Sequence, residues 1–220
     1  MTDVSAEITS EDTSGATAPE PPTNPLLSSL AFWGFVVFIL AYCGTLLGAF
    51  AVQLLGGEFP CPLCMLQRYA MILATIPAMW IVLEALRGTL TRGRYVRSIG
   101  MSIVAACAGS VFATRQILLH ILPGDPGYGS AVLGLHLYTW ALITFQIVIV
   151  FCGVMALLNR HAVPLAPSGS VARVAAKAVV WLFLGVIVAN VVAIIVLEGV
   201  AWVLPDNPTQ YNLLHQLGIS

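Results

Sequence analysis

Long apolar runs alternate with short polar segments along this chain. Five runs stand out, at about residues 29–55, 62–86, 99–122, 137–158 and 178–204. A bilayer core of roughly 30 Å is crossed by about 20 residues of α-helix. Each run therefore predicts one transmembrane helix, and we expect an all-α integral membrane protein without a soluble domain.

The polar segments predict where these helices begin and end. Residues 1–28 are rich in Ser, Thr, Pro and acidic side chains but lack Lys and Arg, so they predict a disordered tail and no cleaved signal peptide. Pro62 suits a first helical turn, because its missing N–H would be unpaired there. Pro and Gly residues at 123–127 end the third run, and residues 205–220 form a short tail.

Composition supports membrane residence. The 220 residues are 59% hydrophobic and only 9% charged, whereas a soluble protein carries about 25% charged residues. A chain with so few charges cannot cover itself with a polar surface. The net charge of −1 argues against a nucleic-acid partner, which would select a basic face.

The basic residues predict the orientation in the membrane. Seven of the nine lie between the second and third runs or between the fourth and fifth, namely Arg87, Arg92, Arg94, Arg97, Arg160, Arg173 and Lys177. By the positive-inside rule, the N-terminus is then cytoplasmic and the C-terminus extracytoplasmic. Cys61 and Cys64 face outward, on the oxidising side of a bacterial inner membrane, where disulfides persist.

The two closely spaced cysteines predict redox chemistry. Cys61 and Cys64 open the second predicted helix, where unpaired N–H groups and the helix dipole stabilise a thiolate. Arg68 lies four residues after Cys64, on the same helix face. It therefore supplies either a counter-charge for Cys64 or hydrogen-bond donors for an acceptor bound beside it. A dithiol at the lipid–water boundary can exchange electrons with a lipid-soluble acceptor, and a quinone is the obvious one.

Other readings of these residues stay open. The two sulfurs are half of a tetrahedral metal site that would need His120 and His136, although we expect no metal. Arg68 can instead extend its long stem to the membrane surface. His120 can bond a quinone oxygen or be satisfied locally.

Arg115 is the other basic residue inside a run. It either belongs to the site or forms an ion pair with Glu198, because each lies shortly before the predicted outer end of its helix. The single cysteines at 43, 107 and 152 are expected to pack in the apolar interior.

The stretch Cys61-Pro62-Leu63-Cys64, followed by Gln67-Arg68-Tyr69, resembles the disulfide bond formation protein B (DsbB) family. The segment from Gly134 to Trp140 supports the resemblance, which covers about residues 30–160. It implies a four-helix transmembrane bundle, here with a fifth transmembrane helix. It also implies oxidation of an extracytoplasmic thioredoxin-like dithiol protein, with electrons passing to a membrane quinone, ubiquinone or menaquinone, and so to the respiratory chain.

The resemblance implies roles for single residues. Cys61 and Cys64 would be the redox-active pair, with Cys64 next to the quinone. Arg68, with Gln67 beside it, would contribute to quinone binding. We further expect a partner thiolate to attack Cys61 as the more exposed sulfur, and Cys64 to leave as a thiolate.

The chain departs from the family in its outer loop, where residues 123–137 contain no second cysteine pair. Either the partner attacks the Cys61–Cys64 pair directly, or another protein supplies the missing pair, or the oxidase function is lost. The main prediction is a thiol:quinone oxidoreductase. The alternatives are a membrane scaffold that docks a redox partner and a thiol carrier that works in the reductive direction.

Overall fold

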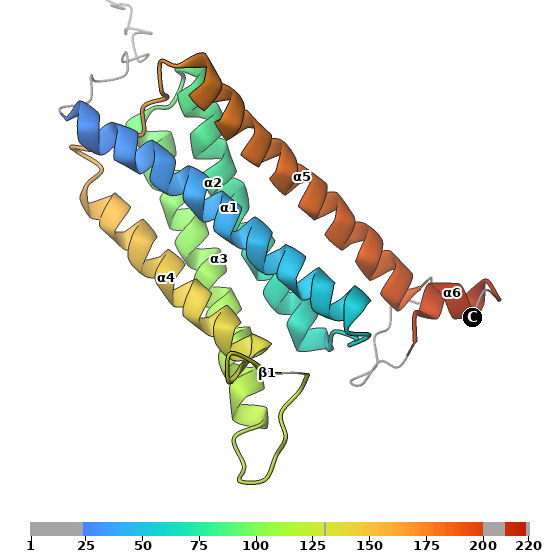
Figure 1. Ribbon diagram of the computed structural model, residues 1–220. Coiled ribbons are helices and arrows are strands. Elements are labelled where there is room, and N and C mark those ends of the chain that lie inside the picture. Colours follow the sequence, from blue (N-terminus) through green and yellow to red (C-terminus); the bar gives the residue numbers. More distant parts are fainter. Residues whose placement is uncertain (1–23, 130, 200–209, 219–220) are drawn as a thin grey trace, which may run out of the picture.

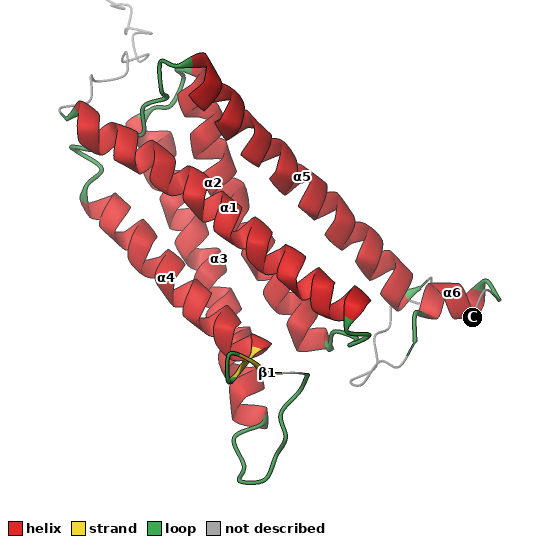
Figure 2. Cartoon of the chain, in the orientation of Figure 1, coloured by secondary structure: helices red, strands yellow, loops and turns green. Residues whose placement is uncertain are grey.

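A computed structural model describes residues 24–129, 131–199 and 210–218 of the chain (Figure 1). Within these ranges lie helices α1 (Pro25–Leu55), α2 (Pro62–Arg87), α3 (Arg92–Leu119), α4 (Leu137–Leu157), α5 (Ser170–Glu198) and α6 (Asn212–Gln216). The strands β1 (Ala131–Val132) and β2 (Leu135–His136) form a small antiparallel hairpin. Figure 2 shows that helix dominates the fold.

The five long helices run side by side. Each is long and apolar enough to cross a membrane, which confirms the prediction of an all-α integral membrane protein. Consecutive helices α1 to α4 pack against their neighbours, and α5 packs against α1 and α2. Figure 1 accordingly shows α4 and α5 on opposite sides of the molecule.

Close packing of aromatic rings and small residues holds the bundle together. Phe35 of α1 and Tyr95 of α3 are fully buried, with ring centroids 5.9 Å apart. Gly109 of α3 lies so close to Phe145 of α4 that an added Cβ would be 2.3 Å from the ring. Lipid removes most of the hydrophobic driving force between helices, so van der Waals packing at such close contacts stabilises their association.

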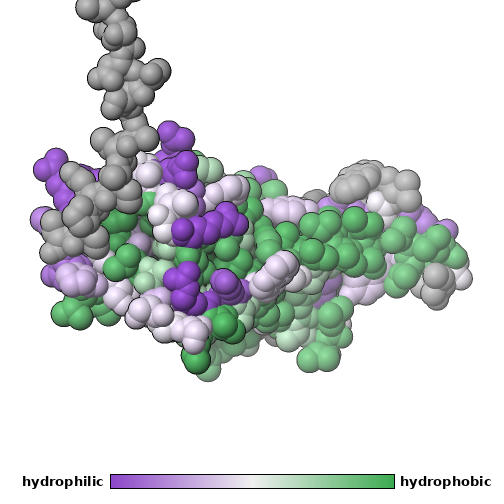
Figure 3. Space-filling model, turned by 90° about the horizontal axis from the view of Figure 1, so that it is seen from above, coloured by the Kyte–Doolittle hydropathy of each residue, from purple (hydrophilic) through white to green (hydrophobic). Residues whose placement is uncertain are grey.

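The helices extend beyond the apolar runs at their basic ends. Helix α3 begins at Arg92 rather than near residue 99, because Thr91 caps it by accepting a hydrogen bond from the Arg94 backbone N–H (3.4 Å). The Arg94 guanidinium then forms an ion pair with Glu84 of α2 (3.1 Å). Figure 3, a view from above Figure 1, shows hydrophilic side chains gathered at this end of the molecule.

The predicted terminal segments are only partly described. Helix α1 begins at Pro25, within the predicted tail of residues 1–28, because the Asn24 side chain accepts from the backbone N–H groups of the first turn. Residues 1–23 lie outside the described ranges. Helix α5 ends at Glu198, where Gly199 adopts a φ of 68°. The rest of the predicted fifth span, and residues 205–209 of the predicted tail, also lie outside those ranges.

Candidate active site

The Cys61–Cys64 pair lies at the start of α2, as predicted. Cys61 is the N-cap, and its Sγ accepts a hydrogen bond from the Cys64 backbone N–H (3.3 Å). The two Sγ atoms are 2.8 Å apart, and both residues are free thiols. A disulfide bond is about 2.05 Å long, so only a small movement separates this dithiol from a disulfide.

The prediction that Cys61 is the exposed sulfur is wrong. Cys61 is 7% exposed, whereas Cys64 is partly exposed. The N-cap geometry turns the Cys61 sulfur back over the first turn of α2, where it receives N–H donors from two directions. The hydrogen bond with the Cys64 thiol, together with burial, raises the pKa of Cys61. Both effects disfavour a thiolate on Cys61.

A glutamine that the sequence analysis did not single out lies against both sulfurs. Gln116, near the end of α3, is 1% exposed. Its Nε2 donates to Cys61 Sγ (3.3 Å) and to Cys64 Sγ (3.4 Å). Its Oε1 accepts a hydrogen bond from Gln67 Nε2 (2.7 Å). Gln67, which was predicted as a site residue, is therefore linked to the two sulfurs by a hydrogen bond to Gln116.

Arg68 is buried but bonded to a different helix. Its guanidinium donates to Gln53 Oε1 (2.8 Å) and to the Ala49 carbonyl (3.2 Å), both on α1. It also lies over the Phe50 ring, 5.3 Å from the centroid. Arg68 is 8% exposed, so it is turned into the bundle instead of out to the surface. Within the described ranges, no hydrogen bond joins it to either sulfur.

A cavity of about 530 Å³ lies next to the pair. Its walls come from α1, α2, the outer loop and the first turns of α4, and they are mostly apolar. Cys64, Gln67 and Arg68 supply polar groups to its lining, and Gln116 does not line it. This volume falls within the range of about 300–1,000 Å³ that is typical of small-molecule sites.

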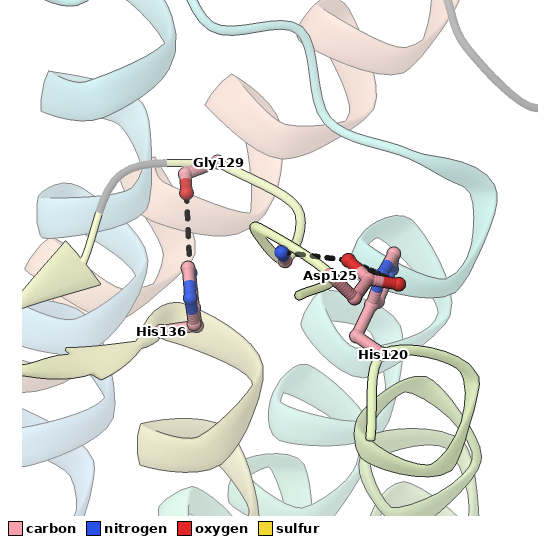
Figure 4. Close-up of polar contacts among 5 residues, drawn as sticks. His120, Asp125, Gly129 and His136 are labelled. Atoms are coloured by element: carbon pink, nitrogen blue, oxygen red, sulfur yellow. Dashed lines mark hydrogen bonds and ion pairs between the residues drawn. The ribbon is translucent and has the colours of Figure 1, made fainter. Parts of the chain in front are cut away.

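The outer loop is held by polar contacts of its own (Figure 4). His120 Nδ1 lies 3.1 Å from Asp125 Oδ1, which also accepts from the Gly127 backbone N–H (2.8 Å). These two contacts lower the pKa of Asp125. His136 Nδ1 lies 3.1 Å from the Gly129 carbonyl. His120, a predicted quinone ligand, therefore serves the loop and does not line the cavity.

Two contacts anchor the turn that precedes the pair. The Tyr128 hydroxyl, on the outer loop, donates to the Phe59 carbonyl (2.6 Å). Tyr211 also packs against the Phe59 ring, with centroids 5.0 Å apart. Tyr211 directly precedes α6, so the C-terminal segment reaches the turn beside the pair.

Arg115 is not brought to the pair. Its side chain is exposed on α3, and it makes no ion pair with Glu198 among the residues that the structure describes. Glu198 lies instead near Tyr69 of α2. In the same described ranges, no three His, Cys, Asp or Glu side chains lie close enough together to hold a metal ion.

Comparison with known proteins points to one family. The family model described as "Disulfide bond formation protein DsbB" matches residues 31–130. The Disulfide bond formation protein B of Marinobacter nauticus is 30% identical over 161 residues, which cover 59% of this chain and 93% of that protein. The Disulfide bond formation protein B 1 of Pseudomonas fluorescens (strain Pf0-1) is 29% identical over 163 residues, or 58% of this chain and 91% of that protein. No solved structure matches the chain.

Proposed function

Because the chain belongs to the disulfide bond formation protein B family, we propose that it is a thiol:quinone oxidoreductase. As a multi-pass inner-membrane protein that forms disulfide bonds, it needs a dithiol donor and an electron acceptor. We propose an extracytoplasmic thioredoxin-like dithiol protein as the donor and a membrane quinone as the acceptor. The basic loops between α2 and α3 and between α4 and α5 support a cytoplasmic N-terminus, with the cysteine pair facing outward.

The observation that carries the proposal is the cavity that Cys64 shares with Arg68 and Gln67. Its apolar walls suit a quinone ring and its isoprenoid tail. Among the N–H donors on its lining, the Arg68 guanidinium and the Gln67 amide lie on the same helix as Cys64, and they would hold quinone carbonyl oxygens. Cys64 is the sulfur that faces this space, so electrons would leave the pair from Cys64.

The first step is attack by a partner thiolate on Cys61 Sγ of the oxidised pair. A mixed disulfide forms, the Cys61–Cys64 bond breaks, and its electron pair stays on Cys64 as a thiolate. Because Cys61 is buried, the turn at Phe59 must move to admit the partner. The Tyr128 and Tyr211 contacts with Phe59 are the restraints that have to loosen.

The second partner thiol then attacks the partner's own sulfur in the mixed disulfide. This releases the partner as a disulfide and leaves both cysteines of the pair reduced. A bound quinone would accept two electrons and two protons as the Cys61–Cys64 disulfide re-forms. Arg68 would orient the acceptor beside Cys64 from a fixed position, because α1 already holds its guanidinium through Gln53 and the Ala49 carbonyl.

The test uses the purified full chain in lipid, a short-chain quinone and a reduced thioredoxin-like dithiol protein. Quinone reduction is expected to depend on the partner and to be lost in Cys61→Ser and Cys64→Ser. Cys107→Ser, which removes an exposed thiol of α3, is the matched control and should keep full activity. Quinone reduction that persists in either variant of the pair would refute the mechanism. Partner binding without any quinone reduction would favour a scaffold.

A trapping experiment separates direct attack from a relay through another protein. In Cys64→Ala the mixed disulfide cannot resolve, so the partner should accumulate as an adduct on Cys61. Direct attack predicts this adduct with the purified chain alone. An adduct that forms only when a second membrane protein with its own cysteine pair is added would show that the relay needs that protein.

A further inference from the structure

Gln116 is the side chain from another helix that contacts both reacting sulfurs. It lies 52 residues after Cys64 along the chain, yet one amide nitrogen reaches both Sγ atoms. A primary amide has two N–H groups, so it can donate to Cys61 and to Cys64 at the same time. The burial of Gln116 excludes water as a competing partner.

The neighbouring glutamine fixes the orientation of this amide. Gln67 Nε2 donates to Gln116 Oε1 across 2.7 Å. If the Gln116 amide were reversed, two NH₂ groups would face one another and the carbonyl oxygen would face the sulfurs. The observed arrangement bonds the carbonyl oxygen to Gln67, with Cys64 Sγ 3.7 Å from the same oxygen, and places the amide nitrogen within 3.4 Å of both sulfurs.

Gln116 matters more as a hydrogen-bond donor for the Cys64 sulfur than for the Cys61 sulfur. Cys61 Sγ also accepts from the Cys64 backbone N–H. For Cys64 Sγ, Gln116 supplies the one N–H donor found among the described residues. Arg68 carries a positive charge nearby, but its hydrogen bonds are committed to Gln53 and Ala49 of α1.

Gln116 does not line the cavity beside Cys64. The cavity is lined by Cys64, Gln67 and Arg68, and Gln116 lies outside that lining, against the sulfurs. A change at Gln116 therefore acts on the thiols without removing a group that touches a ligand in the cavity.

We propose that Gln116 is a catalytic residue that stabilises the thiolate formed on Cys64 when the Cys61–Cys64 disulfide opens. The assignment rests on the proposed function only for the identity of the attacking dithiol, because the thiol chemistry itself needs no quinone. When an incoming thiolate bonds to Cys61 Sγ, the Cys61–Cys64 bond breaks and its electron pair moves to Cys64. The Gln116 N–H donates to that new charge without transferring a proton.

The test is the thiol–disulfide equilibrium of the full chain with reduced and oxidised glutathione, in lipid and without quinone. A hydrogen bond to a charged group changes an equilibrium by roughly 10- to 100-fold. Gln116→Leu is therefore expected to shift the equilibrium toward the disulfide by about that factor. Attack by glutathione should also slow.

Two further variants distinguish donation from packing. Gln116→Glu keeps an acceptor for Gln67 but replaces the amide nitrogen, so it should shift the equilibrium at least as much as Gln116→Leu; if the Leu variant does not fold, the Glu variant decides the question. Gln146→Leu makes the same change at an exposed glutamine of α4 that bonds Ser110, and it should leave the equilibrium unchanged.

The results separate this inference from the proposed function. A folded Gln116→Glu protein whose glutathione equilibrium matches that of Gln146→Leu would overturn the role of Gln116. A shifted equilibrium would support that role even if the wild-type protein failed to reduce quinone, a failure that would count against the proposed function alone.

Discussion

Arg68→Met would remove the guanidinium that joins α2 to α1 beside the cavity. The methionine keeps an apolar stem of similar length, so packing along the helix is largely preserved. Two hydrogen bonds are lost, one to Gln53 Oε1 (2.8 Å) and one to the Ala49 carbonyl (3.2 Å). Gln53 is 4% exposed, so its amide has little access to bulk water as a replacement partner.

The magnitude follows from the charge and the burial. A hydrogen bond to a charged group contributes about 1.5–3 kcal/mol, and neutral interhelical bonds in membranes average about 0.6 kcal/mol. Removing a buried cation also relieves its desolvation penalty. The two effects oppose one another, so the free energy of unfolding of the single variant does not isolate the hydrogen bonds. The coupling between Arg68→Met and Gln53→Leu avoids that problem, because their shared bond can be lost only once. We expect a coupling free energy of about 1–2 kcal/mol.

The measurement is reversible unfolding of the wild type, both single variants and the double variant in mixed detergent micelles. Arg115→Met is the control, because it removes an exposed arginine of α3, and its free energy of unfolding should change little. A coupling below about 0.5 kcal/mol would refute the hydrogen bond between Arg68 and Gln53. The same variants then test the site, since Arg68→Met should raise the KM for quinone and Arg115→Met should not.

Further predictions concern packing and the outer turn. Gly109→Ala should destabilise the fold by about 1–3 kcal/mol, because its Cβ would lie 2.3 Å from the Phe145 ring. Gly100→Ala, with nothing within 4 Å in the same helix, is the control in thermal unfolding, and equal melting of the two variants would contradict the contact. Tyr128→Phe should free the turn at Phe59 and speed alkylation of the first cysteine of the pair, measured by peptide mass spectrometry; unchanged labelling would show that this contact does not limit access. Burial raises the pKa of Tyr128 from 10.0 to about 12, so the contact is intact below pH 10 and is lost as the pH rises toward 12. Labelling of the wild type should approach that of the Phe variant over this range.

The sequence predicted the helices well because membrane thickness dictates their length. A run of apolar residues long enough to cross the bilayer leaves little choice but helix, since lipid offers no partner for backbone groups. It predicted the helix ends less well. Helix α3 starts at Arg92 because a threonine caps it and charged residues continue the helix beyond the apolar run. Hydropathy does not detect that extension.

Local spacing predicted the pair and the arginine but not what surrounds them. Cys61, Cys64 and Arg68 lie within eight residues of one another along the sequence, so their proximity required no tertiary information. Gln116 lies on another helix, and the sequence does not show which way its side chain faces. The partners of Arg68, Gln53 and the Ala49 carbonyl, were not predicted because they also lie on another helix, α1. Burial of Cys61 was missed because it depends on the same packing of α3 against α2.

Two different helices hold the two polar groups next to the pair. Gln116 reaches the sulfurs from α3, and Arg68 is held from α1 at the cavity wall. Packing of α1 and α3 against α2 therefore restrains the first turn of α2, which would suit the proposed reaction, in which Cys64 stays aligned while Cys61 exchanges partners. If Gln116 acts on thiolate charge and Arg68 on the acceptor, as proposed, the stability of the disulfide and the affinity for the acceptor would depend on different helices. A shift of α1 can then alter acceptor binding while the thiol equilibrium, set by α3, stays the same.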